Sequence, residues 1–130
     1  MKKCIFCKII KRKLPAYKIF ENDECIAILD INPINKGHTL IITKIHEDYI
    51  FNLREKRYLN LWKVVKKIGK ILKKATGAKR IGIAVEGFTI PHIHIHLVPV
   101  NSPNELNPLK TYKASKKELL EVKKKIVSFL

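Results

Sequence analysis

The chain has 130 residues, 46% of them hydrophobic, which fits one globular domain with its own core. No apolar run reaches the ~18 residues of a membrane span, and the first residues lack the apolar stretch of a signal peptide. A cytoplasmic protein without membrane partners is therefore expected. The formal charge of +16 attracts polyanions, but solvated Lys-rich helix faces, common in proteins from hot environments, explain it as well.

The strand pattern is clear in chain order. Five segments have the alternating or continuously apolar pattern of strands: residues 17–21, 24–29, 38–43, 80–85 and 92–98. Most are separated by turn residues, among them Gly37 and the Asn and Pro residues around position 33. The pattern predicts an antiparallel sheet of about five strands.

Three segments have helical character. Residues 5–11 predict a short helix or turn. Apolar residues recur at steps of three and four from about residue 53 to 75, which predicts a long helix, and Gly77 supplies its left-handed cap. A loop at residues 101–112 precedes a last helix, which begins with a capping box at Ser115 and runs to about residue 129. The fold class is therefore α+β, with the long helix packed on the sheet.

The segment HIHIH, residues 92–96, contains three of the five histidines. Side chains alternate along a strand, so His92, His94 and His96 share one face while the isoleucines between them point to the core. At ~3.3 Å per residue, the backbones of His92 and His96 are about 13 Å apart. One metal ion, with ligand bonds of about 2 Å, does not reach all three histidines. Divided roles are therefore expected.

The chemistry of this face suits attack on phosphorus. A neutral imidazole is a nucleophile and a general base, and its phosphorylated form can be hydrolysed by water. His38 and His46 bracket another predicted strand, so all five histidines meet if the two strands are neighbours. Gly87 and Thr89 suit contact with an anion, through close backbone approach and a hydroxyl. The alternative is a partly exposed strand face on which the histidines have no function.

These motifs resemble those of the histidine triad (HIT) superfamily, in its hint-like branch. HIHIHLV matches the triad signature H-φ-H-φ-H-φ-φ, and LDINPINKGHTLIITKIH resembles the Asp-x-x-Pro…Gly-His block that precedes it. CIFCKIIKRKLPAYKIFEN is similar to the N-terminal segment of the family. The resemblance covers residues 4–100. Residues 101–130 are expected to form a loop and a C-terminal helix of the same single domain.

The resemblance implies a homodimer that hydrolyses or transfers nucleotidyl groups. Its substrates would be purine nucleoside 5′-monophosphate conjugates, either phosphoramidates or dinucleoside polyphosphates, cleaved through a covalent nucleotidyl-histidine. By position, His94 resembles the nucleophile, His96 its partner at the phosphate or leaving group, and His38 the supporting histidine. Thr89 lies where the family often has Ser or Thr near the scissile phosphate.

The nucleotide-binding residues follow from the same resemblance. Asp30 resembles the carboxylate that accepts hydrogen bonds from the ribose hydroxyls. Phe6, Ile9 and Ile28 are expected at the adenine, although a plain core role fits each of them, and Gly87 is expected near the phosphate. The segment before the triad is shorter than in the family and lacks its Asn, so the phosphate contacts differ from the family pattern.

Cys4 and Cys7 form a C-x-x-C motif, which is half of a tetrahedral zinc site. His46 and His92 complete the set, an arrangement that resembles some HIT proteins and the related uridylyltransferases. A structural zinc is the expectation, with a redox pair or simple packing of small thiols as alternatives. Cys25, in an apolar run, is expected in the core.

Two other functions compete with hydrolysis. One is a regulatory module that binds purine nucleotides with little or no catalysis. The other is a nucleic-acid-binding protein driven by the +16 charge. No nucleic-acid-binding motif is recognisable, so nucleic acid is not expected as a partner.

Overall fold

A computed structural model describes residues 3–130; residues 1–2, part of the N-terminal stretch considered above, lie outside the described residues. Five strands form one antiparallel sheet in the order β1-β2-β3-β5-β4. Their bounds are Lys18–Glu21 (β1), Cys25–Leu29 (β2), Thr39–Thr43 (β3), Arg80–Ala84 (β4) and His94–Val100 (β5). The predicted α+β class with a five-stranded antiparallel sheet is confirmed.

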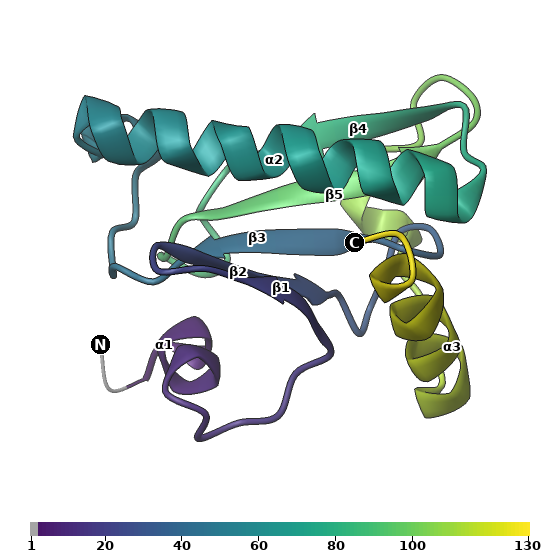
Figure 1. Ribbon diagram of the computed structural model, residues 1–130, viewed down its shortest axis with the longest axis horizontal. Helices are drawn as coiled ribbons and strands as arrows, with labels where there is room; N and C mark the ends of the chain where they lie inside the picture. Colours follow the sequence, from purple (N-terminus) through teal and green to yellow (C-terminus); the bar gives the residue numbers. More distant parts are fainter. Residues whose placement is uncertain (1–2) are drawn as a thin grey trace.

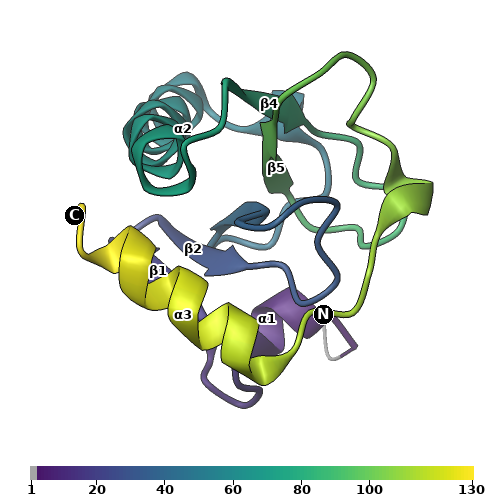
Figure 2. The ribbon, with the colours of Figure 1, turned by 90° about the vertical axis from the view of Figure 1, so that its right-hand side faces the viewer.

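Helices cover both faces of this sheet (Figure 1). The long helix α2, Glu55–Thr76, lies along one face, and the short helix α1, Ile5–Ile10, lies against the other. Figure 2, a view turned by 90°, shows α1 and α2 on opposite sides. Helix α3, Lys116–Val127, crosses one end of the sheet, and its buried side chains join the core beneath α2. Short 3-10 turns at Ile50–Asn52 and Pro108–Lys110 complete the chain.

Helix α2 follows directly from its sequence pattern. Leu61, Val65, Ile68 and Leu72 form the buried stripe that packs on the sheet. The helix ends at Gly77, whose φ of 71° is left-handed and whose N–H donates to the carbonyl of Lys73. The predicted glycine cap is confirmed.

Helix α3 differs from its predicted cap in one respect. The hydroxyl of Ser115 accepts the backbone N–H of Glu118 at 3.1 Å, as in a capping box. The carboxylate of Glu118 instead accepts the phenol O–H of Tyr112 at 2.7 Å, because the preceding loop brings that side chain within reach. The helix ends at Val127, two residues before the predicted end at 129.

The triad strand begins later than predicted. Residues 92–98 were expected, but β5 starts at His94, because the N–H of His92 donates to the carbonyl of Ile90 within a turn after Pro91. At its other end β5 extends to Val100, which pairs with Arg80 of β4. Alternation along the strand still places Ile93, Ile95 and Leu97 in the core beneath α2, as predicted.

The sheet has a hydrophobic core on each face. Beneath α2, nineteen buried residues form the larger cluster, which includes Cys25 as predicted. On the α1 side, Phe6 packs with Ile26, Ile28, Leu40 and Ile42. Within residues 3–130, no helix is both long and apolar enough to cross a membrane.

Candidate functional site

The pairing of β3 with β5 gathers the histidines. Leu40 is opposite His96 and Ile42 is opposite His94, while His38 lies just before β3 and His46 shortly after it. Four of the five histidines thereby take part in two clusters on the α1 side of the sheet, and the fifth, His94, lies between the clusters. The predicted proximity of the two histidine-bearing segments is confirmed.

The first cluster, called here the Cys–His cluster, contains Cys4, Cys7, His46 and His92. Its four Sγ and Nδ1 atoms lie within 4.8 Å of one another. Sγ of Cys4 is 3.3 Å from Nδ1 of His92, and Sγ of Cys7 is 3.2 Å from Nδ1 of His46. The two Nδ1 atoms are 3.1 Å apart. Zinc bonds of about 2.0–2.3 Å in a tetrahedron separate ligand atoms by about 3.3–3.8 Å. The observed spacings lie at the lower end of this range or slightly below it, so the four atoms are close enough to share one zinc ion.

His92 is oriented by a backbone group. Its Nε2 lies 2.6 Å from the carbonyl of Thr43, so this nitrogen must hold the hydrogen and donate it. Nδ1 is then unprotonated, with its lone pair toward the two thiols. His92 is also fully buried, at 0% exposure. Such a hydrogen bond from the second ring nitrogen is typical of a metal-ligating histidine.

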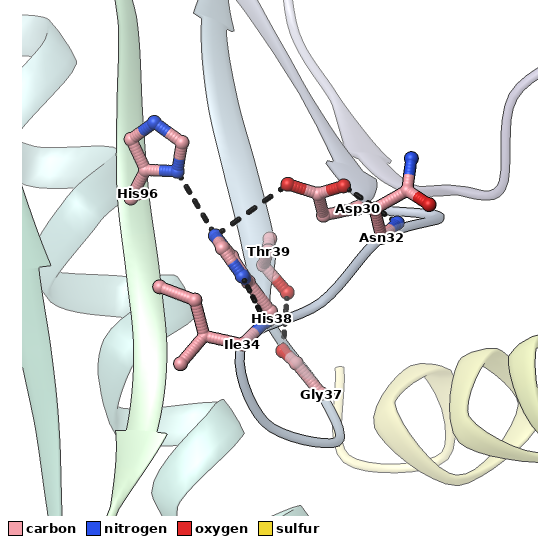
Figure 3. A network of polar contacts seen from close by, with 7 residues as sticks. All are labelled: Asp30, Asn32, Ile34, Gly37, His38, Thr39 and His96. Atoms are coloured by element: carbon pink, nitrogen blue, oxygen red, sulfur yellow. Dashed lines mark hydrogen bonds and ion pairs between the residues drawn. The ribbon is translucent and has the colours of Figure 1, made fainter. Parts of the chain in front are cut away.

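The second cluster, the Asp–His cluster, contains Asp30, His38 and His96 (Figure 3). The backbone N–H of Ile34 donates to Nδ1 of His38 at 3.0 Å, so the hydrogen of His38 is on Nε2. Nε2 then donates to Nδ1 of His96 at 2.9 Å. A carboxylate oxygen of Asp30 is 3.7 Å from the same Nε2. This chain of contacts leaves the hydrogen of a neutral His96 on its outer nitrogen, Nε2.

Burial keeps the two histidines of the Asp–His cluster neutral. It lowers the pKa of His38 to about 4. Burial, then the neighbouring His38 and His94, lowers the pKa of His96 to about 4. The contact of Asp30 with His38 is therefore a polar contact near pH 7 and not an ion pair. Burial also raises the pKa of Asp30, because a carboxylate there has lost part of its hydration.

His94 lies between the two clusters. Its Nδ1 is 2.7 Å from the carbonyl of His92, so the hydrogen of a neutral ring is on Nδ1. Nε2 retains its lone pair and makes no hydrogen bond within the described chain. The ring packs against Phe6, at 4.9 Å between centroids, and against His96, at 5.0 Å. The structure thus presents His94 as an oriented imidazole whose Nε2 has no hydrogen-bond partner in the described residues.

A groove lies beside α1. Its volume is about 630 Å³, and Ile9 and Ile28 are among its lining residues. Phe6 is buried and does not line the groove, because its ring lies against His92 and His94. Two of the three residues expected at the adenine therefore share this groove, and the third supports the histidine face.

Gly87 and Thr89, in the segment before the triad, do not contribute a hydrogen bond to the triad histidines in the described residues. Thr89 is exposed, and no hydrogen bond in residues 3–130 connects it to a triad histidine. Gly87 has a φ of 90°, and a Cβ there would lie 3.1 Å from the carbonyl oxygen of Asp48. The left-handed turn and the nearby carbonyl of Asp48 therefore explain why position 87 is a glycine. The hydroxyl and backbone contacts expected at a phosphate are not formed in this structure.

Two contacts of the site were missed by sequence reasoning. One is the carbonyl of Thr43 at His92, and the other is the ring of Phe6 at His94. No sequence signal marks a backbone carbonyl as a histidine partner. Phe6 within the C-x-x-C motif could have been noticed, since a residue between Cys4 and Cys7 stays close to any site that joins those cysteines to His92.

Known proteins are similar to this chain in sequence. The HIT domain family matches residues 11–102. An uncharacterized HIT-like protein of Borreliella burgdorferi is 41% identical over 103 residues, which cover 74% of each chain. A protein of Candida albicans named adenosine 5′-monophosphoramidase is 35% identical over 108 residues, which cover 74% of this chain and 69% of that one.

Solved structures agree with the sequence matches. A Hit-like protein involved in cell-cycle regulation from Bartonella henselae has a TM-score of 0.87 at 28% identity, over 100% of this chain and 98% of that one. A Zn-bound histidine triad family protein from Mycobacterium smegmatis has a TM-score of 0.82 at 25% identity, over 98% and 93% of the two chains. With the family match spanning most of its length, the chain belongs to the HIT family.

Proposed function

We propose that the protein cleaves purine nucleoside 5′-monophosphate conjugates, phosphoramidates first among them, through a covalent nucleotidyl-histidine at His94. The observation that carries the proposal is the orientation of that ring. Its Nδ1–H is held by the carbonyl of His92, so the lone pair of the neutral ring lies on Nε2. The Candida albicans relative named adenosine 5′-monophosphoramidase supports the substrate class.

In the first step, Nε2 of His94 attacks the α-phosphorus, and the bond from phosphorus to the leaving group breaks. His96 contacts the phosphate or the leaving group through its outer N–H, because its inner nitrogen accepts from His38. Water then attacks the nucleotidyl-histidine, releases the nucleoside monophosphate and restores His94. In this proposal Asp30 accepts hydrogen bonds from the ribose, and Ile9 and Ile28, which line the groove beside α1, contact the base.

The direct test uses adenosine 5′-phosphoramidate with the wild type and with His94→Ala. Turnover is expected to fall roughly a thousandfold or more, because the nucleophile is lost while the binding groove stays. Intact-mass analysis should detect a nucleotidyl adduct on the wild type alone. Equal turnover by both proteins would refute the role of His94. Tight mononucleotide binding by a wild type without turnover would favour the regulatory module.

We propose further that the Cys–His cluster binds a structural zinc. Two thiols and two imidazoles at tetrahedral spacing are a donor set that zinc prefers, and four protein ligands leave no open position. When bound, the ion would hold α1 and its Phe6 against the triad segment. The Mycobacterium smegmatis neighbour described as Zn-bound supports this assignment.

Metal analysis of the purified protein tests the zinc proposal. One equivalent of zinc is expected in the wild type and none in the double variant Cys4→Ser/Cys7→Ser. A Cys25→Ser variant is the matched control, since Cys25 is buried in the other core and should leave the zinc content unchanged. Zinc-free wild type with a Cys4–Cys7 disulfide would favour the redox alternative.

A homodimer is proposed as the assembly. Within residues 3–130, strand β4 pairs with β5 alone, so its other edge is open, and Ile83 on it is 46% exposed. Nε1 of Trp62 on α2 is buried without a hydrogen-bond partner in the described residues. Sedimentation should show a dimer, and Ile83→Lys should shift it toward the monomer.

A further inference from the structure

We propose that the outward face of α2 docks on the phosphate backbone of double-stranded nucleic acid. This lysine face consists of six of the seven exposed lysines of α2: Lys56, Lys63, Lys66, Lys70, Lys73 and Lys74. The seventh, Lys67, has its ammonium group 4.8 Å from the centre of the Phe20 ring. The six lysines of the face point away from the buried stripe of the same helix. From first to last they span about 27 Å along the helix axis, at 1.5 Å per residue. The proposal concerns binding and is separate from the histidine chemistry.

The lysine face has no acidic residue on its own helix after Glu55, the first residue of α2. The sequence has no Asp or Glu between residues 56 and 85. In residues 3–130, the carboxylates that form ion pairs or close His contacts are Glu21 and Asp30, neither of which is on α2. Helix α3 differs, since its lysines are interspersed with Glu118 and Glu121. The positive potential of α2 is therefore not neutralised locally.

The spacing of the lysines also lowers the stability of the helix. Lys66, Lys70 and Lys74 follow one another at steps of four, where like charges repel and destabilise an isolated helix. A face selected only for solubility would mix both signs, as α3 does. The arrangement therefore fits an anionic partner that relieves the repulsion on binding.

The chemistry of the face favours a duplex over a lipid surface or a single strand. From Lys63 to Lys74 every exposed residue is a lysine. Over the whole face, from position 56 to 74, Leu59 is the single exposed apolar residue. Docking on a membrane needs exposed apolar side chains that insert, and single-strand binding needs aromatic side chains that stack with bases. Phosphate-backbone contact needs only cations on a rigid support, and it is independent of sequence.

The location separates this surface from catalysis. The histidines face α1, whereas α2 covers the opposite face of the sheet (Figures 1 and 2). A duplex on α2 would leave the groove at α1 open. Changes on the lysine face should therefore leave hydrolysis unchanged, which allows the two functions to be tested apart.

The experiment measures fluorescence anisotropy of short labelled duplex DNA and RNA with the full chain, between ~50 and ~200 mM salt. The test variant is Lys66→Gln/Lys70→Gln/Lys73→Gln. Its matched control is Lys116→Gln/Lys117→Gln/Lys124→Gln on α3, which removes the same charge from exposed positions. Circular dichroism should show that both variants keep the wild-type helix content.

The α2 variant should bind at least about tenfold more weakly and lose about 2.7 from the slope of log K against log salt, at about 0.9 per phosphate contact. The α3 control should stay near the wild type. If both variants bound the duplexes equally weakly, net charge alone would explain the binding, and the proposal would be overturned. A wild type that does not bind the duplexes, or one that binds phosphatidylserine vesicles instead, would also overturn it.

Discussion

The Cys–His cluster and the Asp–His cluster lie on one face of the sheet and are built from similar side chains, yet they suit different chemistry. In the first, Nε2 of His92 donates to the carbonyl of Thr43, so Nδ1 offers its lone pair to an ion. In the second, Nδ1 of His38 accepts a backbone N–H, so Nε2 donates to His96. The comparison teaches that the backbone partner of one ring nitrogen decides the role of the other.

The largest effect should separate His92 from His96. His92→Ala is expected to lower the free energy of unfolding by about 3 kcal/mol or more, because it empties a fully buried site and leaves the carbonyl of Thr43 unpaired. His96→Ala should instead reduce turnover with a smaller loss of stability. Urea denaturation and phosphoramidate kinetics on both variants measure this. Equal losses of stability in the two variants would show that the two clusters do not differ in this way.

The pH dependence should come from the Asp–His cluster. The pKa of His38 falls from an ordinary 6.5 to about 4 on folding, so the unfolded chain binds more protons between these values. Stability from this group is therefore fully present above pH 6.5 and is lost as the pH falls toward 4.

A His38→Gln variant isolates that contribution. The wild type should lose stability from pH 6.5 to 4 more steeply than the variant, because the variant has one fewer buried imidazole to protonate. At pH 7 the variant should be about 1–3 kcal/mol less stable, since it disturbs the hydrogen bonds to Ile34 and His96. Thermal denaturation over this pH range gives both values, and parallel curves would contradict the assignment.

The smallest effect should come from the residue that joins the two regions. Phe6 contacts the rings of both His92 and His94. Phe6→Leu should cost about 1 kcal/mol, because the core keeps an apolar side chain of somewhat smaller size. Loss of orientation at His94 should lower kcat more than it raises KM. An unchanged kcat would show that Phe6 only fills the core.

The fold was largely predictable because its signals are local. The apolar stripe of α2 and its Gly77 cap can be predicted from the sequence of that helix alone. The alternation of buried and histidine side chains can likewise be predicted from the sequence of β5 alone. Element ends were less accurate. Because of the turn at Ile90, β5 begins later than predicted. The carboxylate of Glu118 accepts a hydrogen bond from Tyr112 instead of its expected capping-box partner. Both deviations come from neighbours outside the element concerned.

At the site, the sequence by itself determined that three histidines share one face and that one ion does not hold them all, because strand geometry is local. Only the tertiary structure decided which nitrogen of each ring holds its hydrogen. Those assignments depend on the backbone groups of Thr43, His92 and Ile34. Such partners are backbone atoms common to every residue type, so their position is set by strand register and turns, not by residue identity.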